Sequence, residues 1–297
     1  MKALLVPSLL TSLLLVGCGS QPDENADAPI AKFVVAMEPD KDPDAMLADR
    51  LALQDYLSGA LEHPVEAIVP LSSAVIYEGL KNGTIDLAYL SSTAAANLMT
   101  SGAIDILLAE LIDGEPHYQS YWISRKDAPY ESIADLKGKP IAFSSRTSTS
   151  GFLIPTWDLY TQGLIDLETG PEGFFGPGNV FYGVGYVSAA ERVLDGSAEA
   201  AAVSYYVLDQ DKHLGADQRA QLKVIDTQGP VPSHVIVVRT ALSSEDREAL
   251  RASLLGMNEA APELRDRIFG ATLAPAEADT HLRITREALE LMRTMKL

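Results

Sequence analysis

Two short apolar runs in the chain each lead directly into a cluster of hydroxyl side chains and then into a helical pattern. In the first, Ile85–Leu90 reads as a strand, Ser91, Ser92 and Thr93 follow, and an alanine-rich helix is expected over 94–99. In the second, Ile141–Phe143 reads as a buried strand, and a helix is expected to begin near Ser150 or Gly151. Two such junctions predict an α/β fold, in which helices follow strands along the chain.

The hydroxyl cluster of the second junction comprises Ser148, Thr149 and Ser150. Free N–H groups and the positive end of the helix dipole make a helix start a site for anions, and hydroxyl groups add donors. Serine and threonine also occur at helix starts for capping alone, so capping and ligand binding both remain open here. Because the same pattern occurs at both junctions, helix capping alone is a less satisfactory explanation than ligand binding.

The alternation of strands and helices continues along the chain. Further strands are expected over 33–37, 65–69, 104–111, 181–184, 200–203, 222–225 and 235–238, and further helices over 45–60, 188–194, 244–255 and 276–295. The run 235–238 is apolar throughout, which is typical of a central strand covered on both faces. In open α/β sheets ligands bind at the carboxyl ends of the strands, where both hydroxyl clusters lie.

The N-terminus has the features of a secretory signal. Met1-Lys2 precedes an apolar run over 3–16, which is too short for an ordinary membrane-spanning helix of about 20 residues. Leu15-Val16-Gly17-Cys18 resembles the lipobox of bacterial lipoproteins, in which the cysteine becomes the lipidated first residue. We therefore predict a signal peptide over 1–17, a lipid anchor on Cys18 and a flexible tether over 18–30, in the periplasm or cell envelope.

Composition excludes several other functions. The formal net charge of the 297 residues is −18, and nucleic acids and anionic membrane surfaces select basic patches instead. The chain contains no Gly-x-Ser-x-Gly elbow, no His-Glu-x-x-His and no phosphate loop, so no catalytic residue is expected. Its five histidines are scattered and its one cysteine stands alone, so neither a metal site nor a cofactor is expected.

Several segments together resemble the phosphonate/phosphite/phosphate-type periplasmic substrate-binding proteins of ABC transporters. The most specific is Ser148-Thr149-Ser150-Gly151-Phe152, preceded by Asp135-Leu136-Lys137-Gly138-Lys139. The resemblance extends over most of the chain and includes 78–90, Tyr118-Gln119-Ser120, 189–196 and Pro232-Ser233-His234.

The resemblance implies a type II binding-protein fold with two α/β lobes, two hinge crossings and a ligand held between the lobes. The lobes would be 31–118 with 232–297, and 119–231. It further implies an oxyanion bound by Ser148, Thr149 and Ser150, a cleft-lining Tyr118, an ABC permease as partner and a monomeric protein. Ser91, Ser92 and Thr93 would form the facing edge of the first lobe.

The chain departs from the family pattern at the positions that would contact the rest of the ligand. Gly185-Tyr186-Val187-Ser188 stands where the family often has Gly-Ser-His-Asp, and Ser204 stands near a frequent acid. Tyr186, Tyr205 and Tyr206 would give a more aromatic and less charged wall, or else pack between helix and sheet. We therefore expect a small oxyanion of the phosphonate, phosphite or phosphate class. The alternatives are a sensor accessory that presents its ligand to a receptor kinase, or a binder of a small molecule without phosphorus.

Overall fold

The computed structural model describes residues 30–37, 43–210 and 213–297, with the side chains of 43–45 outside that description. The predicted signal peptide, Cys18 and nearly all of the tether lie outside the described residues. Within the described part, no helix is both long and apolar enough to cross a membrane.

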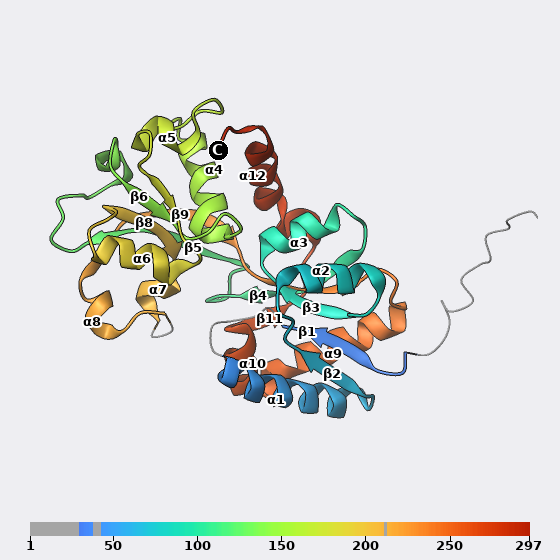
Figure 1. Ribbon diagram of the computed structural model, residues 1–297. Coiled ribbons are helices and arrows are strands. Elements are labelled where there is room, and N and C mark those ends of the chain that lie inside the picture. Colours follow the sequence, from blue (N-terminus) through green and yellow to red (C-terminus); the bar gives the residue numbers. More distant parts are fainter. Residues whose placement is uncertain (1–29, 38–42, 211–212) are drawn as a thin grey trace, which may run out of the picture. The chain divides into compact units, whose positions relative to one another are not determined.

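The strands form two mixed sheets (Figure 1). The first has the order β11-β4-β10-β3-β1-β2 and is built from β1 (Phe33–Ala36), β2 (Val65–Ile68), β3 (Leu87–Leu90), β4 (Ile104–Leu111), β10 (Val235–Arg239) and β11 (Thr272–Ala274). The second has the order β7-β6-β8-β5-β9 and is built from β5 (His117–Arg125), β6 (Ile141–Phe143), β7 (Val180–Tyr182), β8 (Ala200–Ser204) and β9 (Leu222–Pro232). The predicted α/β class is confirmed.

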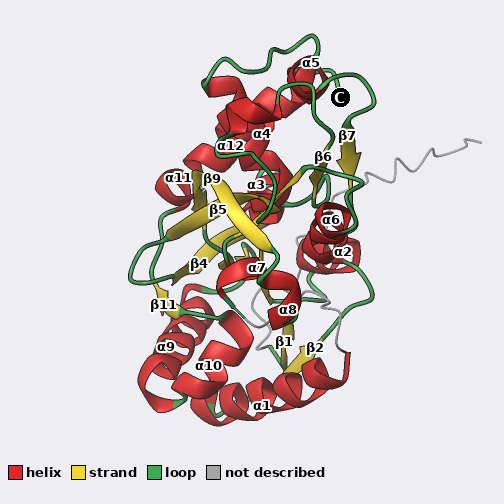
Figure 2. Ribbon diagram, turned by 90° about the vertical axis from the view of Figure 1, so that its left-hand side faces the viewer, coloured by secondary structure: helices red, strands yellow, loops and turns green. Residues whose placement is uncertain are grey.

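Helices cover both faces of the first sheet. On one face α2 (Ser73–Asn82) and α3 (Ser92–Met99) pack into a core with β3 and β10. On the other face α1 (Pro43–Leu61), α9 (Ser244–Ala260) and α10 (Pro262–Phe269) lie against one another (Figure 2). Because both faces are covered, the predicted central strand β10 has Val235, Ile236 and Val237 fully buried.

The remaining helices belong to the second sheet or to the connections. They are the 3-10 helix η1 (Ile133–Leu136), the π-helix η2 (Thr149–Leu153), α4 (Ile154–Thr161), α5 (Gly170–Phe175), α6 (Tyr186–Leu194), α7 (Tyr206–Asp209), α8 (Ala216–Arg219), α11 (Ala278–His281) and α12 (Arg283–Thr294). An aromatic core centred on Trp122, Phe143 and Phe175 fills the space beneath η2 and α4. This core fixes the end of β6, from which the hydroxyl-rich segment departs.

The chain passes between the two sheets twice. It leaves the first sheet after β4 and enters the second at His117, and it returns between Pro232 and Val235. The Ser233 hydroxyl ties the two passages together, because it donates to the carbonyl oxygens of Glu110 at 2.7 Å and of Pro116 at 3.1 Å. The lobe boundaries expected from sequence stay a prediction.

The C-terminal helix packs differently from expectation. The single helix predicted over 276–295 is wrong, because Leu282 separates α11 from α12 with a backbone that interrupts the helical geometry (φ −93°, ψ 6°). Helix α12 contacts α3 of the first sheet and also η2, α4 and β9 of the second. Met295, which follows it, lies in the aromatic core around Trp122. The C-terminal segment of the lobe predicted over 31–118 and 232–297 therefore packs on elements of both sheets.

Candidate functional site

The second hydroxyl cluster forms the start of a continuous helical segment made of η2 and α4. Ser148 precedes this segment, and its hydroxyl accepts a hydrogen bond from the Gly151 amide at 2.9 Å. The helix therefore begins at Thr149, slightly before the predicted start. Pro155 is the second residue of α4, directly after the π-helical turn.

Glycine is required at position 151 by a close approach of the chain to itself. A Cβ atom there would lie 2.4 Å from both Cβ and Oγ of Ser144 and 2.9 Å from the Ser148 hydroxyl. Ser144 cannot withdraw easily, because it is fully buried and its hydroxyl donates to the Ala202 carbonyl at 2.7 Å. Gly151 thus allows the helix start to sit directly against the end of β6.

The first hydroxyl cluster forms the start of α3. The Ser91 hydroxyl accepts from the Ala94 amide at 3.3 Å and caps the helix. Ser92 and Thr93 follow in the first turn, and both side chains are buried. The Ser92 hydroxyl has no hydrogen-bond partner in the part of the chain that the structure describes. A buried hydroxyl without a partner is uncommon and indicates a place for an additional acceptor or donor.

The two helix starts meet. Oγ1 of Thr93 and Oγ1 of Thr149 are 2.8 Å apart, and both side chains are buried. One hydroxyl belongs to α3 beside the first sheet and the other to η2 beside the second. The pair brings two positive helix ends and several hydroxyl groups to one point in the molecule.

Tyrosine side chains surround this point on the side of the second sheet. The Tyr186 hydroxyl lies 2.7 Å from the Ser150 hydroxyl and accepts from Ser148 at 3.3 Å. The rings of Tyr118 and Tyr205 lie 5.5 Å apart between centroids. Ser204, at the end of β8, is fully buried. Tyr118 joins this group through a hydrogen bond with Ser150, and Ser204 directly precedes Tyr205 in the chain.

Burial raises the pKa of two tyrosine hydroxyls beside this point. It is the main cause that raises the pKa of Tyr118 well above its usual range; the nearby Tyr186 hydroxyl raises it further, and a hydrogen bond with Ser150 opposes the shift. Burial likewise raises the pKa of Tyr206, with a further contribution from Tyr186. A tyrosine hydroxyl is protonated at neutral pH even at its ordinary pKa of about 10, so both groups can donate hydrogen bonds there.

The hydrogen bonds of this cluster are made by neutral groups. The contacts that Ser148, Thr149, Ser150 and Thr93 form among the described residues involve hydroxyl groups and amides, with no lysine or arginine among them. Arg146, in the loop before the helix start, places its guanidinium 3.8 Å from the centre of the Tyr182 ring. The attraction for an anion would come from the helix dipoles and the hydroxyl donors.

A second polar group close to the site was not predicted. The buried Glu110 carboxylate accepts from the Tyr89 hydroxyl and from the His234 amide at 3.2 Å, and its Oε2 lies 3.6 Å from His234 Nδ1. Burial, followed by the charge of Glu110, raises the pKa of Tyr89 well above its usual range. This group lies where the chain passes between the sheets. No local sequence pattern indicates this group, because Glu110 is 21 positions from Tyr89 and 124 positions from His234.

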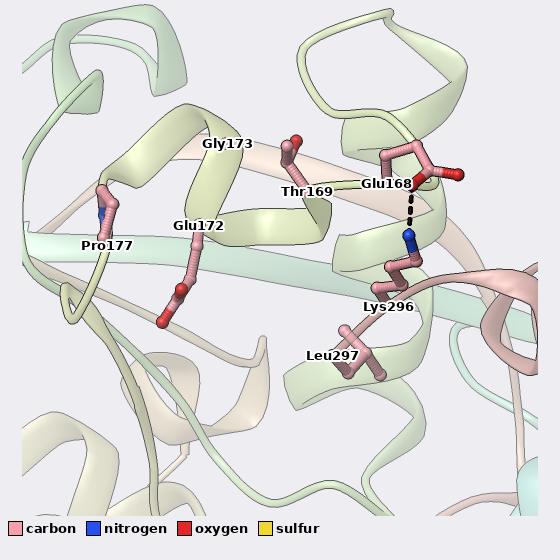
Figure 3. A pocket seen from close by; sticks show the side chains of 7 residues that line it. All are labelled: Glu168, Thr169, Glu172, Gly173, Pro177, Lys296 and Leu297. Carbon is pink, nitrogen blue, oxygen red and sulfur yellow. Dashed lines mark hydrogen bonds and ion pairs between the residues drawn. The ribbon is translucent and has the colours of Figure 1, made fainter.

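A surface hollow near the C-terminus lies apart from these residues (Figure 3). It is lined by Glu168, Thr169, Glu172, Gly173, Pro177, Lys296 and Leu297. Glu168 forms an ion pair with Lys296, while Glu172 adds a second negative charge. The hollow contains none of the predicted site residues and is poorly suited to an anion. Across the described residues, no group of three or more His, Cys, Asp or Glu side chains could hold a metal ion.

The protein has two mixed sheets joined by two chain passages, and two helix starts meet between the sheets. This arrangement is that of the two-lobed substrate-binding proteins. The sequence profile of the family described as "ABC transporter, phosphonate, periplasmic substrate-binding protein" matches residues 35–280. The chain belongs to this family, and the suspected resemblance is confirmed.

Two curated relatives share part of the sequence. The Phosphate-import protein PhnD of Mycolicibacterium smegmatis is 28% identical over 192 residues, which are 63% of this chain and 60% of the relative. The Phosphonates-binding periplasmic protein of Escherichia coli is 25% identical over 191 residues, which are 63% of this chain and 54% of the relative. The matches thus span little more than half the length of these relatives.

Solved structures confirm the type II periplasmic binding-protein fold. A protein from Xanthomonas citri bound to ATP superposes with a TM-score of 0.74 at 20% identity, covering 90% of this chain and 100% of that one. PhnD1 from Prochlorococcus marinus in complex with methylphosphonate gives 0.73 at 16% identity, covering 89% and 99%. A binding protein component of an ABC phosphonate transporter from Pseudomonas aeruginosa gives 0.71 at 20% identity, covering 89% and 87%. At these identities the likeness concerns the fold.

Proposed function

We propose that the protein captures a small oxyanion of the phosphonate, phosphite or phosphate class and delivers it to an ABC permease. The observation that carries this proposal is the contact between Thr93 and Thr149, which joins two helix starts rich in hydroxyl donors. Family membership supports the transport role. In this proposal the protein is a non-enzymatic monomer with lobes 31–118 plus 232–297 and 119–231.

A bound anion would replace the hydrogen bonds that the hydroxyl groups of the site make with one another. Thr93 and Thr149 would donate to the anion instead of pairing with each other, and Ser148, Ser150, Tyr118 and Ser92 would supply further donors. Micromolar affinity corresponds to about −8 kcal/mol. Hydrogen bonds to a charged group contribute roughly 1.5–3 kcal/mol each, so four to six donors suffice after ordering costs.

Isothermal titration calorimetry with phosphate, phosphite and methylphosphonate tests the proposed function. We expect at least one of the three to bind with a dissociation constant of about micromolar or lower. A titration in which all three anions give no heat and no thermal shift would contradict the proposal. Sulfate serves as a comparison, because it has the same tetrahedral shape but carries no proton at neutral pH.

The lipid anchor is a separate part of the proposal, and it rests on the Leu15-Val16-Gly17-Cys18 pattern. We expect Cys18→Ser to move the protein from the membrane fraction to the soluble fraction of the cell envelope, since no other cysteine is available for lipidation. Fractionation and immunoblotting measure this distribution. If the variant stays with the membrane after a high-salt wash, Cys18 is not the anchor.

A further inference from the structure

The loop between β6 and η2 carries an exposed arginine directly beside the second hydroxyl cluster. Backbone hydrogen bonds fix both ends of this loop: the Ser144 amide donates to the Gly151 carbonyl at 3.0 Å, and the Ser148 amide donates to the Ser145 carbonyl at 3.1 Å. Arg146 is exposed and lies two residues before Ser148. Because a residue spans at most about 3.6 Å of chain, the Cα atoms of Arg146 and Ser148 are no more than about 7 Å apart.

An aromatic ring, and not a carboxylate, holds the Arg146 side chain. Its guanidinium lies 3.8 Å from the centre of the Tyr182 ring. Burial raises the pKa of the Tyr182 hydroxyl, while the charge of Arg146 opposes this shift and that of Glu172 adds to it. Among the described residues, no carboxylate forms an ion pair with Arg146, whereas Arg239 pairs with Asp86 at 2.7 Å. The positive charge of Arg146 therefore has no contacting counter-charge.

The ring beneath Arg146 belongs to the aromatic core that supports η2. Tyr182 ends β7 and lies opposite Phe143, which ends the parallel strand β6. The Tyr182 ring lies 5.9 Å from the Phe143 ring and 5.5 Å from the Phe152 ring. Phe152 is part of η2 and follows Ser150 by two residues. The guanidinium is therefore held at the carboxyl ends of β6 and β7, where the hydroxyl cluster begins.

Stacking leaves the hydrogen-bonding edge of this guanidinium free. A guanidinium contacts a ring through its planar face, and its N–H donors lie in that plane. Among the described residues, none accepts a hydrogen bond from Arg146. The side chain is thus held in place while its donors remain available to an anion that arrives from solvent.

The charge of the whole chain makes such a residue useful. The formal net charge of −18 opposes the approach of an anion. The helix dipole acts within about one turn and hydrogen bonds act only on contact, so the hydroxyl clusters attract a ligand at short range. A charge at the rim of a site mainly changes the association rate and its dependence on salt. Electrostatic steering of this kind raises association rates by about 10- to 1,000-fold.

We infer that Arg146 is a capture residue, whose stacked guanidinium raises the rate at which the oxyanion reaches Ser148, Thr149 and Ser150. The hydroxyl groups and helix starts then hold the anion. This inference rests on the proposed function and adds a residue to its site.

The association rate constant of Arg146→Gln tests the inference. It is measured by stopped-flow tryptophan fluorescence with whichever of phosphate, phosphite and methylphosphonate binds the parent protein most tightly. At an ionic strength of about 10 mM, where the screening length is about 30 Å, we expect a rate at least threefold below that of the parent protein. At about 1 M the screening length is about 3 Å, and the difference should fall below 1.5-fold. The dissociation rate constant should stay within twofold, and Arg146→Lys should restore the association rate to within twofold.

Arg192→Gln is the matched control. Arg192 lies in the last turn of α6, with its guanidinium 4.9 Å from the centre of the Phe181 ring. Phe181 and Tyr182 are neighbours in β7, so their side chains point to opposite faces of the sheet. The control removes the same charge from the same kind of ring contact. It should change the association rate less than 1.5-fold.

The possible results separate the inference from the proposed function. An unchanged association rate in Arg146→Gln, an equal loss in Arg192→Gln, or a change confined to the dissociation rate would overturn the role of Arg146 and leave the proposed function standing. If the parent protein binds none of the three anions in calorimetry, the proposed function fails, and the inference fails with it.

Discussion

Replacing Ser148, Thr149 and Ser150 together by alanine is expected to lower oxyanion affinity by at least about a thousandfold. Each hydroxyl can donate to a charged oxygen, and such a bond contributes roughly 1.5–3 kcal/mol. Three bonds at the lower value give about 4.5 kcal/mol, and every 1.4 kcal/mol is about a factor of ten. Titration calorimetry of the triple variant against the tightest ligand of the parent protein measures the loss.

The same loop supplies the control for this variant. Ser145 and Thr147 carry hydroxyls 3.2 Å apart, before the helix start and away from the contact with Thr93. Ser145→Ala/Thr147→Ala should bind within threefold of the parent protein. Loss of the Ser148 cap costs about 1 kcal/mol, and the Thr149 and Ser150 hydroxyl bonds contribute about 1 kcal/mol each, so a thermal melt of the triple variant accompanies the titration to establish that it is folded. Unchanged affinity in a folded triple variant would place the ligand elsewhere.

The largest expected loss of stability comes from Phe143→Ala. Phe143 ends β6, is fully buried, and has ring contacts with Trp122 at 5.6 Å, Phe152 at 5.2 Å and Tyr182 at 5.9 Å. Removing such a ring leaves a cavity and lowers the free energy of unfolding by about 3–5 kcal/mol. Urea unfolding followed by circular dichroism should give a clearly lower midpoint.

Tyr160→Ala is the comparison for the core variant. Tyr160 lies in α4 and has 38% of its surface exposed, so its removal should change the free energy of unfolding by less than about 1 kcal/mol. A Phe143→Ala midpoint no lower than that of Tyr160→Ala would mean that the aromatic core does not hold β6 in place.

The local parts of the site were predictable because each depends on neighbouring residues. The apolar run Ile141–Phe143 became β6 at the expected residues, and Ser148 caps the helix that follows. The reason for Gly151 was not predictable. It depends on the distance to Ser144, and only the folded turn sets that distance. The π-helical geometry of η2 likewise has no local sequence signal.

The features of the fold and the site that were not predicted depend on contacts between segments that are distant in the sequence. Thr93 and Thr149 are 56 positions apart in the sequence and come into contact in the fold. The local pattern does not predict this contact. The resemblance to the family predicted only that the two hydroxyl clusters face each other. The group of Tyr89, Glu110 and His234 likewise forms from three segments that are distant in the sequence. The break at Leu282 was missed because the helical pattern continues across it, while the fully buried Leu282 side chain packs into the core of the first sheet.

Helix α12 limits how the chain can be shortened or labelled. Leu289 packs against the core around α3, whereas Leu291 and Met292 pack against the core around Trp122. A chain cut after Leu282 would expose apolar surface of both cores at once, so the C-terminus is a poor place for truncation. Leu297, with 52% of its surface exposed, lies just past this helix. A fluorescent dye attached there through a short linker would sit next to a helix that touches both α3 and η2, and could report oxyanion capture without altering the site.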